Sequence, residues 1–188
     1  YLTFTGHKDL LAMPGVGGLC SKTPLSFPPL IQGGTGIHGE SYVNPSIYPE
    51  AYESGTLNMP AIWSLKNSIE YITENKHDIQ EQENLLTERM LDGLATLQNV
   101  VVYNPQAARV PTMCFNVHGV ASSDVVSFLD KKEICVRGGI HCAILAHEAL
   151  GTVETGAVRI SMNYMNTVSE VDTFLNEIGA LCHESGLL

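Results

Sequence analysis

Charged residues are scarce in this chain, and basic residues are scarcer still. Only 16% of the 188 residues are charged, and 20 acidic side chains outnumber 10 lysines and arginines, which gives a formal net charge of −10. Because such a chain repels a phosphate backbone, we expect no nucleic-acid partner. Apolar residues make up 44% of the sequence. This composition excludes extended disorder and predicts a globular protein with a buried core.

Long apolar runs and a signal peptide are also absent. No stretch approaches the ~20 apolar residues of a membrane span, and the first residues lack the basic and apolar regions of a secretory signal. We therefore expect a cytoplasmic protein with no membrane partner. The five cysteines are odd in number and widely spaced, which predicts reduced thiols rather than a disulfide framework.

The N-terminal part of the chain is dominated by turn-forming residues. An alternating apolar stretch from Leu2 and the run GVGGLC (15–20) predict two strands. Residues 24–52 are rich in Pro, Gly, Ser and Tyr without a helical or strand period, which predicts a long functional loop. A helix with one apolar face begins near Pro60.

The remainder, residues 76–188, shows the periodicities of a small domain of helices and strands. The sequence predicts, in order, a helix over 78–98, strands over 99–103 and 110–117, a helix capped by Ser122 or Ser123 and running to Lys132, a strand over 134–137, a helix over 143–150 and a C-terminal helix. A capping box from Thr167 to Glu170 begins that last helix, and Gly186 ends it.

The first candidate site is the sequence Thr5-Gly6-His7-Lys8. A lysine amine can form an imine with an aldehyde cofactor, and the His7 imidazole and Thr5 hydroxyl could donate hydrogen bonds to a phosphate. The alternative is an idle lysine at the protein surface.

A second candidate site is ESGTLN (53–58), which precedes the helix near Pro60. The Thr56 hydroxyl and backbone amides at a helix N-terminus indicate an anion site. The alternative is an ordinary helix cap by Thr56 or Asn58.

The third candidate site is VRGGIHCA (136–143). Its glycines predict a mobile loop between Arg137 and Cys142, and a thiol beside His141 at the start of a helix is typical of an activated nucleophile. The alternatives are a packed structural cysteine, or a metal pair of Cys142 with His141 and His147. No second pair follows at ligand spacing, so we expect no metal.

The fourth candidate residue is Arg159, which lies inside an otherwise apolar strand. A buried guanidinium needs a partner, and a substrate carboxylate bound through two hydrogen bonds would serve. A structural ion pair with one of the protein's own acidic residues is the alternative.

In this order, the four sites resemble the C-terminal half of class V, fold type I, pyridoxal-phosphate enzymes, and most closely the cysteine desulfurase and selenocysteine lyase branch. The resemblance rests on GHK, ESGTLN, VRGGIHCA and HEALGTVETGAVRISMNYMNTVSEVD. It implies an α/β fold in which residues 1–75 form the end of the large PLP-binding domain and residues 76–188 form a small α+β domain.

The same resemblance implies how the cofactor is held. Lys8 resembles the Schiff-base lysine of pyridoxal 5'-phosphate, and Thr5 and His7 resemble ligands of its phosphate. Thr56 would reach the phosphate of the neighbouring subunit, which implies a homodimer with a shared active site.

The substrate groups follow from the resemblance too. Arg159 resembles the clamp on the substrate carboxylate, Arg137 resembles a second contact near the substrate, and Cys142 matches the cysteine that attacks the substrate sulfur. The implied reaction removes sulfur from L-cysteine, or selenium from selenocysteine, and leaves alanine. Sulfur would remain on Cys142 as a persulfide and pass to an acceptor such as a carrier protein.

Several features depart from the family pattern. Ile144 stands where many relatives have proline, and DLLAMPGVGG follows Lys8 in place of the commoner LLGP. In the family, an aspartate at the pyridine nitrogen and a ring-stacking histidine precede the lysine, but only seven residues do so here. We therefore expect a fragment with little activity or cofactor retention unless a second polypeptide supplies the missing half.

Two other functions remain as alternatives. An aminotransferase or lyase of the same fold would leave Cys142 as a bystander. A non-catalytic C-terminal fragment would serve dimerisation or partner binding through the exposed, broken edge of the large domain.

Overall fold

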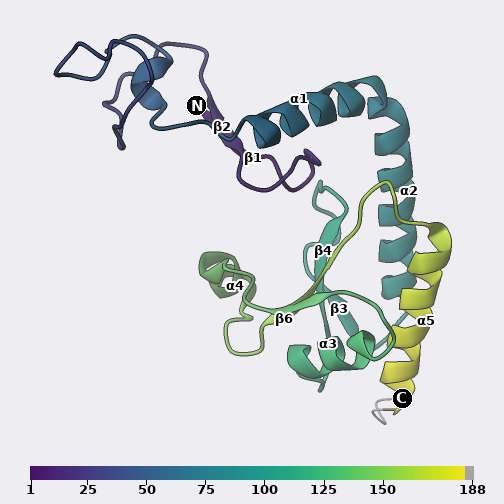
Figure 1. Cartoon of the computed structure of the whole chain (residues 1–188). Coiled ribbons are helices and arrows are strands. Elements are labelled where there is room, and N and C mark those ends of the chain that lie inside the picture. The colour runs from purple at the N-terminus through teal and green to yellow at the C-terminus, as the bar shows by residue number, and fades with distance from the viewer. Residues whose placement is uncertain (185–188) are drawn as a thin grey trace. The chain divides into compact units, whose positions relative to one another are not determined.

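The chain divides into two compact units, Tyr1–Asn75 and a second that begins at Lys76. The computed structural model describes residues 1–184, so the helix-ending role expected of Gly186 lies outside the described residues. Figure 1 shows the helices and strands of both units. Among the described residues, no helix combines the length and apolar character needed to cross a bilayer. The assignment of the two units to a large and a small domain stays a prediction.

A hairpin, a long loop and a helix make up the first unit. β1 (Leu2–Thr5) pairs antiparallel with β2 (Gly17–Cys20), which confirms both predicted strands. The loop that follows holds no strand or helix before the 3-10 helix η1 (Glu50–Tyr52). α1 (Met59–Glu74) then begins behind Asn58, whose side chain accepts a hydrogen bond from the Ala61 amide at 3.3 Å.

The second unit is a four-stranded antiparallel sheet with helices. Its elements are α2 (Lys76–Ala95), β3 (Val100–Val102), β4 (Thr112–Val117), α3 (Ser122–Asp130), β5 (Arg137–Gly139), α4 (Ile144–Leu150), β6 (Ala157–Ser161) and α5 (Val168–Glu184). The strand order is β3-β4-β6-β5, and every neighbouring pair is antiparallel. The mixed helix and strand content agrees with the predicted fold class.

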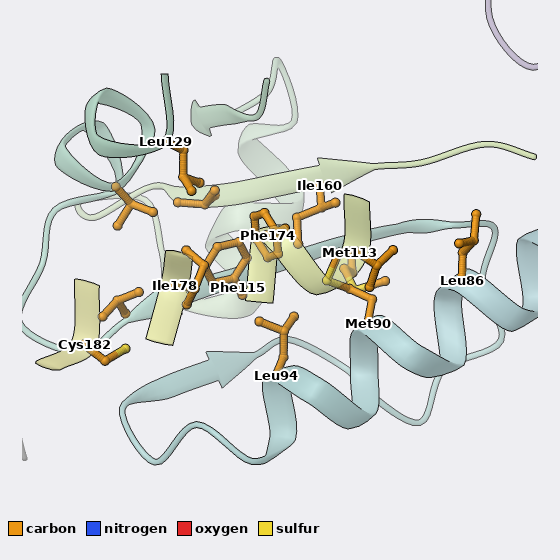
Figure 2. Packing of buried hydrophobic residues seen from close by; sticks show 14 residues of the cluster. Leu86, Met90, Leu94, Met113, Phe115, Leu129, Ile160, Phe174, Ile178 and Cys182 are labelled. Carbon is orange, nitrogen blue, oxygen red and sulfur yellow. The ribbon is translucent and has the colours of Figure 1, made fainter. Parts of the chain in front are cut away.

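One face of this sheet carries the hydrophobic core. Along β4, Met113, Phe115 and Val117 are buried and alternate with half-buried residues, as a strand with one covered face requires. Helices α2, α3 and α5 complete the same cluster, which Figure 2 shows around Phe115 and Phe174. The opposite face of β4 and β6 is therefore free to carry polar side chains.

The predicted capping box at the start of α5 is confirmed. The Thr167 amide donates to Glu170 Oε2 at 2.7 Å, and the Glu170 amide donates to Thr167 Oγ1 at 3.2 Å. Hydrogen bonds from the backbone and side chain of Thr167, and one from Asn166, lower the pKa of the Glu170 carboxyl. This box fixes where the last helix begins.

The predicted serine cap of α3 is wrong. The cap position is Ala121, which makes no side-chain cap bond. The hydroxyl of Ser122 instead donates to the carbonyl oxygen of Thr155 at 2.9 Å. This bond joins the start of α3 to the segment that leads into β6, so a tertiary contact takes the place of the local cap.

The predicted strand over 134–137 is displaced by three residues, and the predicted mobile glycine loop after it is wrong. β5 begins at Arg137, and Gly138 and Gly139 both pair with β6. A Cβ atom on Gly138 would lie 2.9 Å from the Val126 side chain and 3.0 Å from the Ser122 carbonyl oxygen. Glycine is therefore needed for close approach to α3, and this segment is ordered sheet.

Two adjacent leucines of α2 test the position of the core. Leu86 is 0% exposed and Leu85 is 49% exposed. We expect Leu86→Ala to lower the free energy of unfolding by about 2–5 kcal/mol, because it removes buried methyl groups and leaves a cavity. Leu85→Ala is the matched control and should lower it by less than about 1 kcal/mol. Urea unfolding measures both, and equal losses would contradict this core.

Candidate active site

A tight turn at the end of β1 presents the first group of predicted site residues. The Gly6 amide donates to the Val16 carbonyl oxygen at 2.9 Å, and the Ala12 amide donates to the Gly6 carbonyl oxygen at 2.8 Å. A Cβ atom on Gly6 would lie 2.8 Å from Val16 Cγ1, so only glycine fits without displacement. The turn leaves Thr5, His7 and Lys8 on the exposed side of the hairpin.

Thr5, His7 and Lys8 together offer the groups that an aldehyde phosphate needs. Thr5 Oγ1 and His7 Nδ1 lie 3.1 Å apart and share a hydrogen bond. Lys8 makes no ion pair with any carboxylate in residues 1–183, and the residue is exposed. A hydroxyl, an imidazole and an amine within four residues fit a phosphate and an aldehyde carbonyl on one molecule.

Thr56 lies just before α1 but does not cap it. Asn58 occupies the cap position, which settles which of the two residues provides the cap. Gly55 adopts φ +78°, a left-handed conformation that suits glycine, and its amide donates to the Gly34 carbonyl oxygen at 2.8 Å. Thr56 is exposed. Its hydroxyl is thus not used in starting the helix.

Two arginines stand opposite each other on the sheet face that the core leaves free. Arg137 of β5 is the register partner of Arg159 of β6, and Cys114 of β4 is the partner of Arg159 on the other side. Paired residues of antiparallel strands point to the same face, and like charges directly opposite repel. Among the side chains of residues 1–183, neither arginine forms an ion pair with a carboxylate.

Unpartnered polar atoms mark the same face. Arg159 Nε is buried and has no hydrogen-bond partner, and neither does Asn116 Oδ1. The Asn116 amide nitrogen donates to the Gly156 carbonyl oxygen at 2.9 Å, which holds this side chain against the entry to β6. A buried donor without a partner is rare in a folded protein and indicates a missing acceptor. A carboxylate would fill that role for Arg159.

Cys142 lies at the turn between β5 and α4. His141 and Cys142 both adopt φ +57°, so two consecutive non-glycine residues are left-handed. Cys142 is exposed, which contradicts a packed structural cysteine, and Arg137 Nη2 lies 3.9 Å from its Sγ atom. None of the five cysteines forms a disulfide in the part of the chain that the structure describes. In the described part of the chain, no three His, Cys, Asp or Glu side chains cluster as metal ligands.

Two histidines behind Cys142 form a connected pair. His141 Nε2 lies 3.0 Å from the Arg137 carbonyl oxygen, and His141 Nδ1 lies 3.3 Å from His147 Nε2. His147 Nδ1 in turn lies 2.7 Å from Thr152 Oγ1. Burial is the largest cause acting on the pKa of His141, and it lowers that pKa. The hydrogen bond to the Arg137 carbonyl raises the pKa of His141, whereas interactions with Arg159, His147 and Arg137 lower it.

From the sequence, His147 is a candidate only as a metal ligand, and no pattern marks Thr152 as a site residue. His147 is 3% exposed within a short apolar helix, and a buried imidazole requires partners for both ring nitrogens. That requirement was the available signal. The structure thus brings together Thr5, His7 and Lys8 in the first unit, and Arg137, Cys142 and Arg159 in the second.

Known proteins are similar to this chain over most of its length. A family model described as aminotransferase class-V matches residues 1–174. A probable cysteine desulfurase from Pyrococcus abyssi is 34% identical over 96% of this chain and 46% of its own length. A cysteine desulfurase from Pectobacterium atrosepticum is 32% identical over 92% of this chain and 43% of its own length. The chain therefore spans less than half of each of these relatives.

A solved structure supports the fold. The apo cysteine desulfurase from Thermococcus onnurineus NA1 superposes with a TM-score of 0.81 at 30% identity, covering 95% of this chain and 46% of that one. This likeness confirms the predicted fold type I architecture. With the match over residues 1–174, it shows that the chain belongs to the class-V aminotransferase family, whose members depend on pyridoxal phosphate.

Proposed function

We propose that the protein is a pyridoxal-phosphate-dependent cysteine desulfurase that converts L-cysteine to alanine and takes the sulfur on Cys142. The observation that carries this proposal is an exposed thiol 3.9 Å from Arg137 Nη2, on a turn beside the sheet face where Arg159 Nε lacks a partner. Relatives at 32% and 34% identity bear the name cysteine desulfurase or probable cysteine desulfurase, which supports the same chemistry.

The first unit supplies the groups that would hold the cofactor. Lys8 would hold it through its amine, Thr5 and His7 would bind its phosphate, and Thr56 would bind the phosphate of a second subunit. When bound, pyridoxal phosphate supplies an electron sink for bonds at the substrate's α-carbon. A lysine amine released by the substrate can then carry a proton at that carbon. The exposed Lys8 is free to do so.

The second unit supplies the groups that would hold the substrate. The Nε–H and one Nη–H of an arginine donate in parallel to a carboxylate, so a bound amino acid would satisfy the buried Nε of Arg159. Arg137 lies directly opposite and adds a second positive charge. An unsatisfied buried donor costs about 1–3 kcal/mol, which binding of the substrate carboxylate would recover.

Within this chain, the Cys142 thiolate would be the group that takes the sulfur. Its Sγ would form a bond to the substrate sulfur while the substrate's carbon–sulfur bond breaks. The electron pair of that bond would go to the carbon, which would take up the proton released from the Cys142 thiol and become the alanine methyl group. The turn that holds Cys142 is exposed, so a persulfide there is accessible to a sulfur acceptor. Selenocysteine places the same demands on these residues and belongs to the same substrate class.

A homodimer with shared active sites is part of the proposal. The Thr56 hydroxyl is exposed and is not the helix cap, and large apolar residues of the preceding loop, such as Leu30 and Tyr42, are fully exposed. A second copy of the chain would cover these residues and receive Thr56. A cytoplasmic location fits cysteines that form no disulfide among the described residues, because a reducing compartment keeps disulfides from forming.

The proposed nucleophile is tested by replacing Cys142. In the protein expressed from its complete gene and supplied with pyridoxal phosphate and L-cysteine, mass spectrometry should find one added sulfur on Cys142. Cys142→Ser should abolish release of sulfur and alanine, because a hydroxyl cannot take the sulfur as a persulfide. Cys135→Ser, at another exposed cysteine, is the control and should keep activity. Undiminished turnover by Cys142→Ser would instead support an aminotransferase or lyase.

Replacement of Arg159 should separate binding from stability. Arg159→Met should reduce kcat/KM for cysteine about 10- to 100-fold, the loss of a charged hydrogen bond of about 1.5–3 kcal/mol. The same change should raise the free energy of unfolding of the substrate-free protein by up to about 1 kcal/mol, because it removes like-charge repulsion across the strands.

Arg89→Met is the control for this experiment, because Arg89 donates to Asp172 in an exposed ion pair. Its loss should lower stability slightly and leave kcat/KM unchanged. Urea unfolding and steady-state kinetics measure the two quantities. A strong loss of stability with unchanged kcat/KM in Arg159→Met would assign that arginine a structural role.

A further inference from the structure

We propose that His147 is a positioning residue for sulfur transfer: its Nε2–H holds the His141 ring, and that ring holds the turn that presents Cys142. The inference rests on the proposed function, but neither histidine is a group that the reaction itself uses. His147 lies in α4 and is buried, whereas Cys142 is exposed at the turn before that helix.

The directions of the hydrogen bonds follow from one fixed acceptor. A carbonyl oxygen can only accept, so His141 Nε2 must donate to the Arg137 carbonyl at 3.0 Å. In neutral His141 the other nitrogen, Nδ1, is then an acceptor, and His147 Nε2 must donate to it at 3.3 Å. His147 Nδ1 is left to accept from the Thr152 hydroxyl at 2.7 Å. One set of tautomers satisfies every nitrogen of the pair.

This chain of hydrogen bonds bridges the turn that holds the thiol. The His141 ring contacts β5 through Arg137 and α4 through His147, while Cys142 lies between these two elements. The turn itself has one backbone bond, from the Ala143 amide to the Ile140 carbonyl oxygen at 3.0 Å. Left-handed φ angles at His141 and Cys142 are unfavourable for non-glycine residues and persist only where the surroundings enforce them. The His141 ring provides that enforcement.

Charge keeps the bridge in its neutral form. Arg137 of β5, Arg159 of β6 and His147 of α4 face His141, and each opposes a positive charge on its ring. With burial, which is the largest cause, they lower the pKa of His141. A protonated His141 would carry a hydrogen on Nδ1, and His147 could accept it only after its own proton moved from Nε2 to Nδ1, with the Thr152 hydroxyl then accepting. The arrangement in which His147 Nε2 donates to His141 therefore holds at neutral pH and is lost as the pH falls through the lowered pKa.

Asparagine and glutamine at position 147 form a matched pair for the test. The glutamine amide nitrogen lies where His147 Nε2 lies and can still donate to His141, whereas the asparagine amide lies near Nδ1 and reaches only toward Thr152. We expect His147→Asn to lower kcat about 100-fold, the effect of a misplaced reacting group of about 1 Å. His147→Gln should retain kcat within about threefold. KM for L-cysteine should change less than about twofold in both, because Arg159 is untouched.

Controls keep the result interpretable. His118→Asn changes an exposed histidine and should leave kcat unchanged. Thr152→Val removes the hydroxyl that fixes the His147 tautomer and should lower kcat about tenfold. If His147→Asn fails to fold, the kcat of Thr152→Val tests the positioning role of His147 in its place. Equal kcat for His147→Asn and His147→Gln, or an unchanged kcat in Thr152→Val, would overturn the proposal.

A measurement without substrate separates this proposal from the proposed function. In histidine labelled with 15N, the imidazole shifts of both His141 and His147 should show a bare Nδ1 and a protonated Nε2 at neutral pH. The pKa of His141 should rise in His147→Asn and stay low in His147→Gln. A protonated Nδ1 on either ring would overturn the bridge even if the enzyme is active. If these shifts appear but wild-type protein takes no sulfur onto Cys142, the desulfurase function alone has failed.

Discussion

The candidate site depends on two arginines that face each other on the sheet without a carboxylate to balance their charge. Arg137 and Arg159 are register partners on the sheet face opposite the core, and Arg159 Nε is buried without a hydrogen-bond acceptor. A fold selected for stability alone would place a carboxylate or an apolar side chain there. The retained charges instead fit an anionic ligand, and the exposed thiol 3.9 Å from Arg137 lies beside them.

The placement of the thiol depends in turn on close packing behind it. Gly138 lets β5 approach α3 so nearly that a Cβ atom would contact Val126 at 2.9 Å. This fixes the strand from which the turn to Cys142 leaves, and the His141 ring fixes where the turn arrives at α4. Cys142 is therefore exposed but held at both ends, which suits the role that we propose for it as the acceptor of the substrate's sulfur.

Periodicity and local capping rules predicted most of the fold, and failures occurred where tertiary contacts decide. The long helix α2, the strands β3 and β4 and the Thr167–Glu170 capping box all follow from patterns within a few residues of one another. Gly138 suggests a flexible loop because the α3 residue that packs against it is distant in the sequence. Ser122 suggests a helix cap because Thr155, to which its hydroxyl donates, is also distant in the sequence. The pairing of His147 with Thr152 needed the geometry of a short helix and its end.

We propose that the free sheet face of the second unit binds the carboxylate of an amino acid next to a reactive thiol. A crystal structure of the protein from its complete gene, with pyridoxal phosphate and L-alanine bound, would test this proposal. We expect the alanine carboxylate within hydrogen-bond distance of Arg159 Nε, with Cys142 Sγ facing the alanine methyl group. A carboxylate bound elsewhere, with Arg159 paired to an acidic residue of the protein itself, would contradict it.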